Sequence, residues 1–359
     1  MMRMIKIFLF STVLGLLTIP SFGQSSCTQT LRLAQSTYEQ GRLHEIPTIL
    51  KNCIETKGFN STEELVTAYK ILINSYIYLE EPELADATML KLLETDHFFA
   101  INEAVDPAEF IALYKTFRVD PLFRFGFKVG PTATMPAISE LYSVNGGAQG
   151  NGKVSPKVNL SVGVVFEKDF FGFIKNFSIA PEIVYVVRTY DYTNSDFNYY
   201  DQFPDAPVIQ QAQNTHKQSW LDLNLLGQYK WKESSLNPYI SLGPGISYIL
   251  GSTNELRTQV EGQGAVTGPK IPTKSSYNSF AYSVILSTGA KFRLGGFYLT
   301  GDIRYQLGLN NVVNPSGRTN IEAAFDYGYV PSDYRHNNVT ANIGLVIPYF
   351  KPMKLTNKK

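Results

Sequence analysis

After residue 120 the sequence consists of eight successive segments in which apolar and polar residues alternate. In the first segment, Phe123, Phe125 and Phe127 alternate with Arg124 and Lys128. A period of two places successive side chains on opposite faces of a strand, so each segment predicts a β-strand with one apolar and one polar face. This pattern excludes a mainly helical fold for most of the chain.

The connections between the predicted strands alternate in length. Those after the second, fourth and sixth strands are short, and those after the first, third, fifth and seventh are long and rich in Asn, Gly, Ser, Pro and Gln, at 131–155, 192–216, 252–276 and 310–335. A soluble sandwich also has alternating strands, but this regular order of loops over an even number of strands is typical of an outer-membrane barrel. We therefore expect an eight-stranded antiparallel transmembrane β-barrel over residues 119–351.

The polar faces of these strands predict the content of the barrel interior. Eight strands enclose a space that side chains can fill, so a conducting pore is not expected. The charged residues expected to form a polar network in the lumen are Arg124, Lys128, Glu182, Arg188, Asp222, Lys230, Lys291, Arg293, Asp302 and Arg304. Basic residues outnumber acidic ones in this set, and because unpaired buried charges are costly we expect ion pairs, water and exposure near the barrel ends.

The N-terminus has the pattern of an export signal. Arg3 and Lys6 precede an apolar run over residues 7–19. Small residues follow, which predicts a signal peptide over 1–23 and a mature start at Gln24. No later stretch is apolar over 18 or more residues, so no helical membrane span is expected.

Export permits a disulfide, and Cys27 and Cys53 are the two cysteines of the chain. We expect them to form a structural disulfide between two neighbouring helices. An acylated Cys27 is an alternative, although the three residues before it lack the apolar residue that such a site carries. A redox pair is a second alternative, but its usual Cys-x-x-Cys spacing is absent.

Residues 24–118 have helical periodicity and predict a small all-α domain. The segment at 38–46 resembles the turn between the two helices of a tetratricopeptide repeat, and 76–87 occupies the equivalent place further on. These segments predict two tetratricopeptide-like helix pairs, which are too few to stand alone. The domain is acidic, with 8 Lys and Arg against 14 Asp and Glu. Its candidate residues for binding a protein partner are Leu43, Ile46, Tyr69, Tyr76 and Tyr78, which could instead pack the helices together.

Composition limits the remaining functions. Lys and Arg number 32 against 31 Asp and Glu, which gives no reason to expect a nucleic-acid partner. Four histidines and two cysteines predict no metal site and no cofactor. His216, Ser219 and Asp222 could be imagined as a catalytic triad, but Ser219 and Asp222 would point to opposite faces of one strand. We therefore expect a protein that is not an enzyme.

The sequence resembles the outer-membrane β-barrel proteins of Bacteroidota of the PorT-like or OmpX-like kind. The resemblance lies in the signal peptide, the DPAEF sequence at 106–110, the APEIVY sequence at 180–185 and the segment 239–245. It implies an outer-membrane location and a barrel shape, with outer-membrane lipid as surroundings, and it implies no catalytic residue. Some relatives serve secretion and gliding machinery.

The expected function is that of an integral outer-membrane protein whose helical domain docks a periplasmic or outer-membrane protein, as an accessory of a secretion or surface-assembly complex. Strand parity places the helical domain and a basic tail, 352–359, in the periplasm. The alternative is adhesion or ligand binding by the external loops. Its candidate aromatic residues, which could also belong to membrane-interface girdles, are Phe197, Tyr199, Tyr200, Tyr327, Tyr329 and Tyr334.

Overall fold

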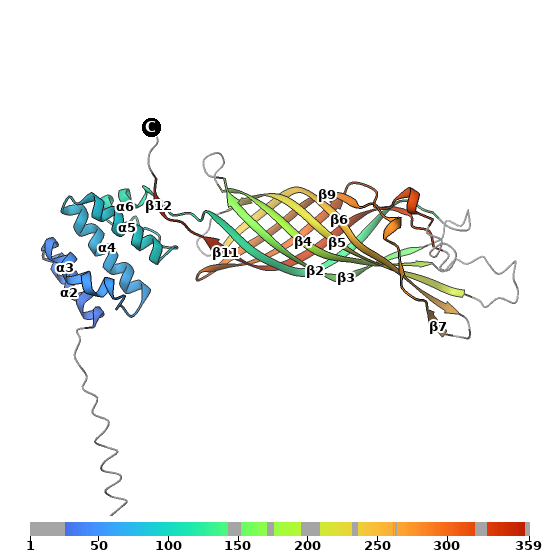
Figure 1. The fold of residues 1–359 in the computed structure, drawn as a ribbon, viewed down its shortest axis with the longest axis horizontal. Coiled ribbons are helices and arrows are strands. Elements are labelled where there is room, and N and C mark those ends of the chain that lie inside the picture. Colours follow the sequence, from blue (N-terminus) through green and yellow to red (C-terminus); the bar gives the residue numbers. More distant parts are fainter. Residues whose placement is uncertain are drawn as a thin grey trace, which may run out of the picture. The chain divides into compact units, whose positions relative to one another are not determined.

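The computed structural model describes residues 26–142, 152–170, 176–194, 209–231, 236–260, 262, 264–319 and 329–355. The chain forms two compact units, seen in Figure 1: Pro121–Phe350 form a β-sheet unit, and the residues before Pro121 join those from Lys351 in a helical unit. The predicted signal peptide, 1–23, lies outside the described residues.

The helical unit contains the helices that the apolar periodicity indicates. They are α2 (Cys27–Glu39), the short 3-10 helix η2 (Leu43–Glu45), α3 (Ile46–Glu55), α4 (Thr62–Tyr78), α5 (Pro82–Thr95) and α6 (Ala108–Tyr114). The Ser61 side chain caps α4 by accepting a hydrogen bond from the Glu64 N–H, and Pro82 opens α5. Within the described part of the chain, no helix is long and apolar enough to cross a membrane. The tetratricopeptide assignment of these helices stays a prediction.

Two apolar clusters hold the helical unit together, and α4 contributes to both. One cluster contains Leu50 of α3 and Ala68 of α4, which are both fully buried. The other contains Ile73 of α4, Leu92 of α5 and Phe110 of α6, also fully buried. Because α4 uses neighbouring faces for the two clusters, its buried residues concentrate between Ala68 and Ser75.

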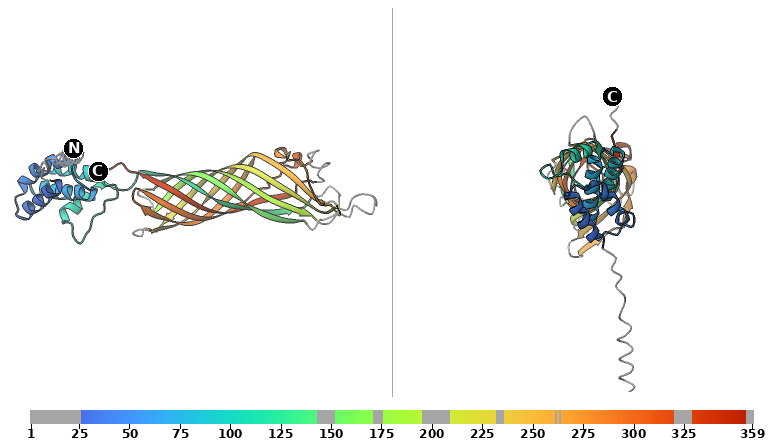
Figure 2. Two further views of the ribbon diagram at one scale, coloured as in Figure 1. Left: turned by 90° about the horizontal axis from the view of Figure 1, so that it is seen from below. Right: turned by 90° about the vertical axis from the view of Figure 1, so that its left-hand side faces the viewer.

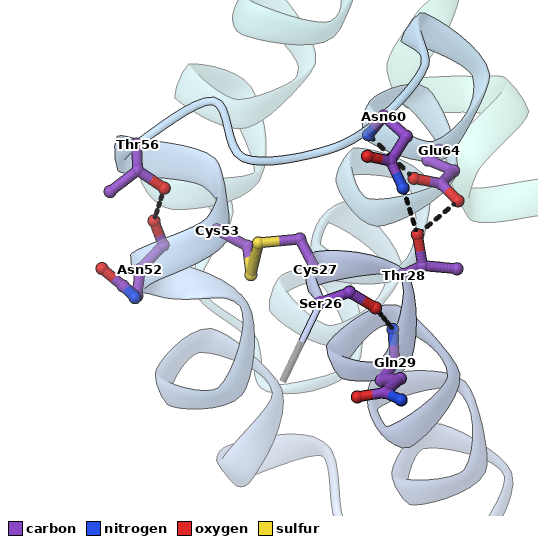
Figure 3. The surroundings of a disulfide bond; sticks show 9 residues. All are labelled: Ser26, Cys27, Thr28, Gln29, Asn52, Cys53, Thr56, Asn60 and Glu64. Atoms are coloured by element: carbon purple, nitrogen blue, oxygen red, sulfur yellow. Dashed lines mark hydrogen bonds between the residues drawn. A yellow bond between two sulfur atoms is a disulfide. The ribbon is translucent and has the colours of Figure 1, made fainter. Parts of the chain in front are cut away.

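The disulfide between Cys27 and Cys53 joins the first turn of α2 to α3 (Figure 3). The two Cα atoms are 5.6 Å apart, a separation that disulfides ordinarily span. Beside it, the Thr28 hydroxyl donates to Glu64 at 2.9 Å, and Asn60 donates to the same hydroxyl at 2.9 Å. The start of α2 is thus fixed both covalently and through hydrogen bonds to the start of α4.

The C-terminal residues belong to the helical unit, which differs from the separate tail expected at 352–359. Strand β12 (Met353–Lys354) pairs antiparallel with β1 (Phe117–Arg118). The Leu355 N–H donates to the Thr116 carbonyl at 2.7 Å, and Lys354 forms an ion pair with Asp86 of α5. Residues 353–355 are held here because the edge of β1 offers backbone partners and Asp86 of α5 offers a carboxylate.

A buried ion pair in the helical unit makes its stability depend on pH. Lys70 and Asn102 both donate to the Asp106 carboxylate, from the ammonium group and from the backbone N–H. Burial alone would raise the pKa of Asp106, but these hydrogen bonds and the Lys70 charge outweigh burial and hold that pKa below its usual 3.8. A depressed carboxyl pKa stabilises the folded state fully above the unfolded-state value, and the stabilisation is lost as pH falls below it.

We therefore expect Asp106→Asn to lower the thermal midpoint of the helical unit at pH 7, with a difference from the parent protein that shrinks below about pH 3.8. Helical circular dichroism on heating, recorded from pH 7 to pH 3, measures it. A difference that stays constant over this range would show that the Asp106 charge does not contribute.

The sheet unit is an antiparallel sheet of ten strands in which each long strand pairs with its neighbours in the chain. The long strands are β2 (Phe123–Glu140), β3 (Lys153–Asp169), β4 (Phe177–Asn194), β5 (Ile209–Lys230), β6 (Leu236–Val260), β9 (Phe280–Leu294), β10 (Phe297–Gly308) and β11 (Asp333–Tyr349). They close into a ring because β11 pairs with β2 over most of its length, for example Leu345 with Phe127. Figure 2 shows these strands running obliquely around the barrel.

The remaining two strands are short and lie outside the ring of eight long strands. Short strands β7 (Gly264–Thr267) and β8 (Ile271–Pro272) pair with β6, in a connection that was expected to be a loop. They form because β6 runs on to Val260 and exposes a free edge there. Other strands are also longer than expected, so β2 extends to Glu140 and the connection from β4 to β5 is only 195–208.

Candidate functional site

The outward face of the barrel carries a continuous apolar belt. On β5 the outward positions from Leu221 to Trp231 are apolar, and Leu223 and Leu225 are 49% and 52% exposed. Such a run has the length of a strand that crosses a bilayer, about 9–11 residues. Before it, the outward side chains of Ser219 and Lys217 are polar. So large an exposed apolar surface is not typical of a soluble protein and fits contact with lipid.

Aromatic side chains mark both boundaries of this belt. At the end with the short connections, the Phe123 ring stacks on Phe166 and Tyr349 with centroids 5.1 and 4.9 Å away. At the end with the long connections, Tyr248 and Phe280 lie 5.3 Å apart. Girdles of this kind flank the apolar band of membrane barrels. We call the two ends the short-connection end and the long-connection end.

Inside the barrel, the first group of charges lies toward the short-connection end. Asp169 accepts from Arg124 at 2.8 Å and from Lys230 at 2.6 Å. Lys291 donates to Glu167 at 2.5 Å and to Gln228 at 2.9 Å. Each cation therefore has a carboxylate partner although all are mostly or fully buried.

A second group surrounds two carboxylates in the middle of the barrel. Glu182 accepts from Lys128 at 3.0 Å and from Arg304 at 2.6 Å, and Asp302 lies 3.1 Å from the Lys128 ammonium. The Tyr239 hydroxyl donates to Asp302 at 3.1 Å. Two cations and two carboxylates thus form one connected cluster with a side chain from β2, β4, β6 and β10.

A third ion pair lies closer to the long-connection end. Arg188 of β4 donates to Asp222 of β5 at 2.7 Å, and its guanidinium lies 5.2 Å from the Trp220 ring centroid. Each residue of this pair lines a small cavity. Asp222 lines one of about 30 Å³, and Arg188 lines one of about 10 Å³. They have room for one or two water molecules rather than a solute. Asp222 and Asn224 line the larger of these two cavities, and the Oδ1 atom of each has no hydrogen-bond partner in the part of the chain that the structure describes.

The structure places most of the expected lumen charges together and adds two that sequence reasoning missed. Glu167 and Asp169 lie at the end of β3 and bring the carboxylates close to balance with the cations. Glu167 lies four residues after the inward-facing Gly163 and has the same parity along β3. Extending the alternation of this strand would therefore have predicted that Glu167 faces the lumen. Arg293 lies near the end of β9 and is exposed, so it is not part of these buried groups, as expected for charges near the barrel ends.

An aromatic core fills the barrel at the long-connection end. Its buried members are Val186, Tyr190, Trp220, Ile249, Tyr277, Ala281, Val312, Val313 and Tyr334. The Tyr190 hydroxyl donates to Tyr334 at 2.7 Å. His216 stacks on Tyr190 with centroids 4.9 Å apart, and His336 meets the edge of Trp220 at 5.4 Å. Both imidazoles are buried, and among the described residues their nitrogens have no hydrogen-bond partner.

His216, Ser219 and Asp222 do not come together, as the alternation along the strand predicts. His216 and Asp222 are buried inside the barrel, whereas the Ser219 hydroxyl accepts a hydrogen bond from Tyr185 on the outward face. In the described part of the chain, no group of three or more His, Cys, Asp or Glu side chains is arranged to hold a metal ion.

Two of the expected partner-binding residues are part of the helical core. Ile46 is fully buried and Tyr69 is 7% exposed, so neither can contact a partner, because each packs between helices instead. Leu43 and Tyr76 are half-buried, and Tyr78 is 51% exposed at the end of α4.

The expected loop aromatics have mixed positions. Phe197, Tyr199, Tyr200 and Tyr327 lie outside the described residues. Tyr334 is only 3% exposed and belongs to the aromatic core, because β11 directs its side chain into the barrel. The prediction that Tyr334 lies on a loop surface is therefore wrong. Tyr329 is half-buried, with its ring 4.6 Å from His216.

Comparison with known proteins finds a family but no curated relative. The sequence model of a family described as "Outer membrane protein beta-barrel domain" matches residues 117–314. No curated protein matches the sequence. Among solved structures, the chain is similar to the Neisserial surface protein A, at 12% identity and TM-score 0.30, over 63% of this chain and 97% of that one. It is also similar to OprG from Pseudomonas aeruginosa, at 12% identity and TM-score 0.35, over 65% and 98%.

Proposed function

The chain belongs to the outer-membrane β-barrel domain family, and from that premise we propose that it is a non-enzymatic integral outer-membrane protein whose helical unit docks a protein partner in the periplasm. The observation that carries the proposal is the pairing of a closed, side-chain-filled barrel with a separate helical unit. The barrel supplies anchorage in lipid. The helical unit has its own core and leaves part of its surface for contacts.

The charged lumen supports anchorage rather than transport. Its ion pairs link strands that are not neighbours in the sheet, as when Lys291 of β9 reaches Glu167 of β3. Cross-links of this kind tie opposite walls together. The cavities beside them have volumes of about 30 and 10 Å³, which suit water molecules.

The surface proposed for docking surrounds the turn between α4 and α5. Tyr78 and Leu84 are 51% and 47% exposed there. Tyr38 of α2 lies near Tyr78: burial and then the neighbouring Tyr78 raise the pKa of the Tyr38 hydroxyl. Glu80, Glu81 and Glu83 flank these residues in sequence. A partner segment with apolar and basic side chains fits this surface.

We expect a partner to co-purify in stoichiometric amounts with the tagged protein from detergent-solubilised membranes, and to be lost from a Tyr78→Ser/Leu84→Ser variant. Removing both apolar side chains deletes the centre of the contact, where most of the binding energy lies. Mass spectrometry of the co-purified chains measures it. Leu33→Ser is the matched control, because Leu33 is 55% exposed on α2. Recovery of the barrel alone would refute docking and favour recognition by the long connections.

The orientation of the protein gives a second prediction. If the long connections face outward, a membrane-impermeant maleimide should label a Lys270→Cys variant in intact cells, because this side chain is 67% exposed beside β8. A Glu94→Cys variant in α5 should react only after the outer membrane is permeabilised. The native cysteines are joined in a disulfide and do not interfere. Labelling of both variants in intact cells would refute a periplasmic helical unit.

A further inference from the structure

The barrel wall has a seam between β2 and β3 at the long-connection end. The two strands pair from Arg124 and Glu167 up to Ala133 and Val158. Beyond that point β2 continues to Glu140 paired only with β11, and β3 at 153–157 is paired only with β4. Within the described residues, the backbones of this hairpin are therefore not joined over its upper part.

The rest of the wall at this end is connected. β5 and β6 stay paired up to Ile209 and Val260. Between β6 and β11, the Asn278 N–H donates to the Val312 carbonyl, and the Val312 N–H donates to the Tyr334 carbonyl. At this end the described neighbouring strands other than β2 and β3 are paired or joined by backbone hydrogen bonds, apart from a register shift between β3 and β4 at Lys157–Ser161.

Apolar side chains lie on both edges of the seam, beside polar ones such as Lys157, which is 44% exposed and pairs with Asp191. Met135 and Val158 are 40% and 73% exposed and continue the outward apolar belt up to the seam. Ile138 of β2 and Val154 of β3 are half-buried and pack against the aromatic core. An apolar molecule that leaves the lipid at this point would meet Met135 and Val158 on the outside, and Ile138 and Val154 next to the core.

The two edges are poorly suited to accept another strand. Pro136 lies on the β2 edge and Pro156 on the β3 edge, and proline has no N–H to donate to a sheet. Backbone pairing is what gives strand addition its affinity. The edges therefore favour an occupant that needs no hydrogen bonds.

We propose that this seam is a lateral binding site for the acyl chain of a membrane lipid, which lies between β2 and β3 against Ile138 and Val154 and reaches the aromatic core near Tyr190. The occupant follows from the continuity of the seam with the lipid-facing belt and from the prolines on its edges. The proposed site rests on the proposed membrane location. The experiment below distinguishes a failure of the site from a failure of the membrane location.

The test uses the full-length protein in phosphatidylcholine vesicles with the photoreactive residue p-benzoylphenylalanine at one position at a time. Val154 reports on the seam. Leu223 is the positive control, since it is 49% exposed on the lipid-facing belt, and Ile249 is the negative control, since it is 1% exposed in the same aromatic core away from the seam. After irradiation, mass spectrometry measures protein carrying a covalent lipid.

We expect lipid adducts at Leu223 and at Val154, and none above the unirradiated background at Ile249. No adduct at Val154 while Leu223 reacts would overturn the seam site and leave the membrane location standing. No adduct at Leu223 would overturn the membrane location itself. Equal adducts at Val154 and Ile249 would mean a loose interior rather than a seam, and a protein adduct at Val154 would mean a strand partner, so both contradict the proposal. If the Val154 variant does not fold, Ile138 on the opposite edge gives the same readings.

Discussion

Glu182→Gln is expected to lower the free energy of unfolding of the barrel by about 3–5 kcal/mol, because removing one partner leaves buried charge uncompensated. Glu182 is 3% exposed and pairs with both Lys128 and Arg304. In the variant, Asp302 alone remains to balance these two cations. Glutamine keeps the volume of the side chain, so the change reports on charge rather than on a cavity. Urea unfolding of the protein in lipid vesicles, followed by Trp fluorescence, measures the difference.

The double variant Lys128→Met/Glu182→Gln is the matched control for the charge argument. It removes one cation and one anion, and it leaves Arg304 facing Asp302 at 3.8 Å. Replacing a buried ion pair by uncharged groups of similar volume is often close to neutral. The double variant should therefore be more stable than Glu182→Gln alone. A single variant as stable as the parent, or a double variant less stable than the single one, would contradict the proposed role of charge balance.

Cys27→Ser/Cys53→Ser is expected to destabilise the helical unit by about 3.5 kcal/mol in the chain-entropy description of a disulfide. The bond closes a sequence separation of 26 residues, and its loss lets the unfolded helical segment explore more conformations. Guanidinium unfolding followed by the helical circular dichroism signal measures the change. Since Cys53 is buried, serine also leaves a hydroxyl in an apolar site.

Reduction of the parent protein separates these two contributions. A thiol reductant breaks the bond without introducing serine, so the reduced protein should show most of the destabilisation. The β-sheet signal serves as an internal control, because the disulfide lies in the helical unit and the barrel should unfold at an unchanged denaturant concentration. An unchanged helical midpoint after reduction would show that the helical core alone sets the stability of this unit.

Much of the barrel could be predicted because the alternation of apolar and polar residues is visible within each strand. Alternation at Phe123–Phe127 and along β5 depends only on which face meets lipid, and a period of two is visible in a single strand. The expected inward positions of Glu182, Asp302 and Arg304 follow from the same parity. Which carboxylate pairs with which cation could not be read from the sequence. Lys291 and Glu167 are on strands that come together only when the ring closes.

The helical unit shows the same division. The positions of Leu50 and Leu72 in their helices indicate a buried side. For Ile46 and Tyr69 the sequence left open whether they bind a partner or pack the helices together, because helical periodicity does not say which side meets a neighbouring helix. The pairing of β12 with β1 was also missed. This pairing joins segments that are separated in the sequence by all strands of the barrel. A strand of two residues has no local pattern that predicts its partner.

The sequence by itself determined the class of the protein. The alternating strands, the order of their connections and the apolar face that contacts lipid are all visible in short segments of the chain. Tertiary structure alone decided the charge balance of the lumen, the return of the C-terminus to the helical unit and the seam between β2 and β3. These features depend on contacts between distant segments, whose free energy exists only once the ring has closed.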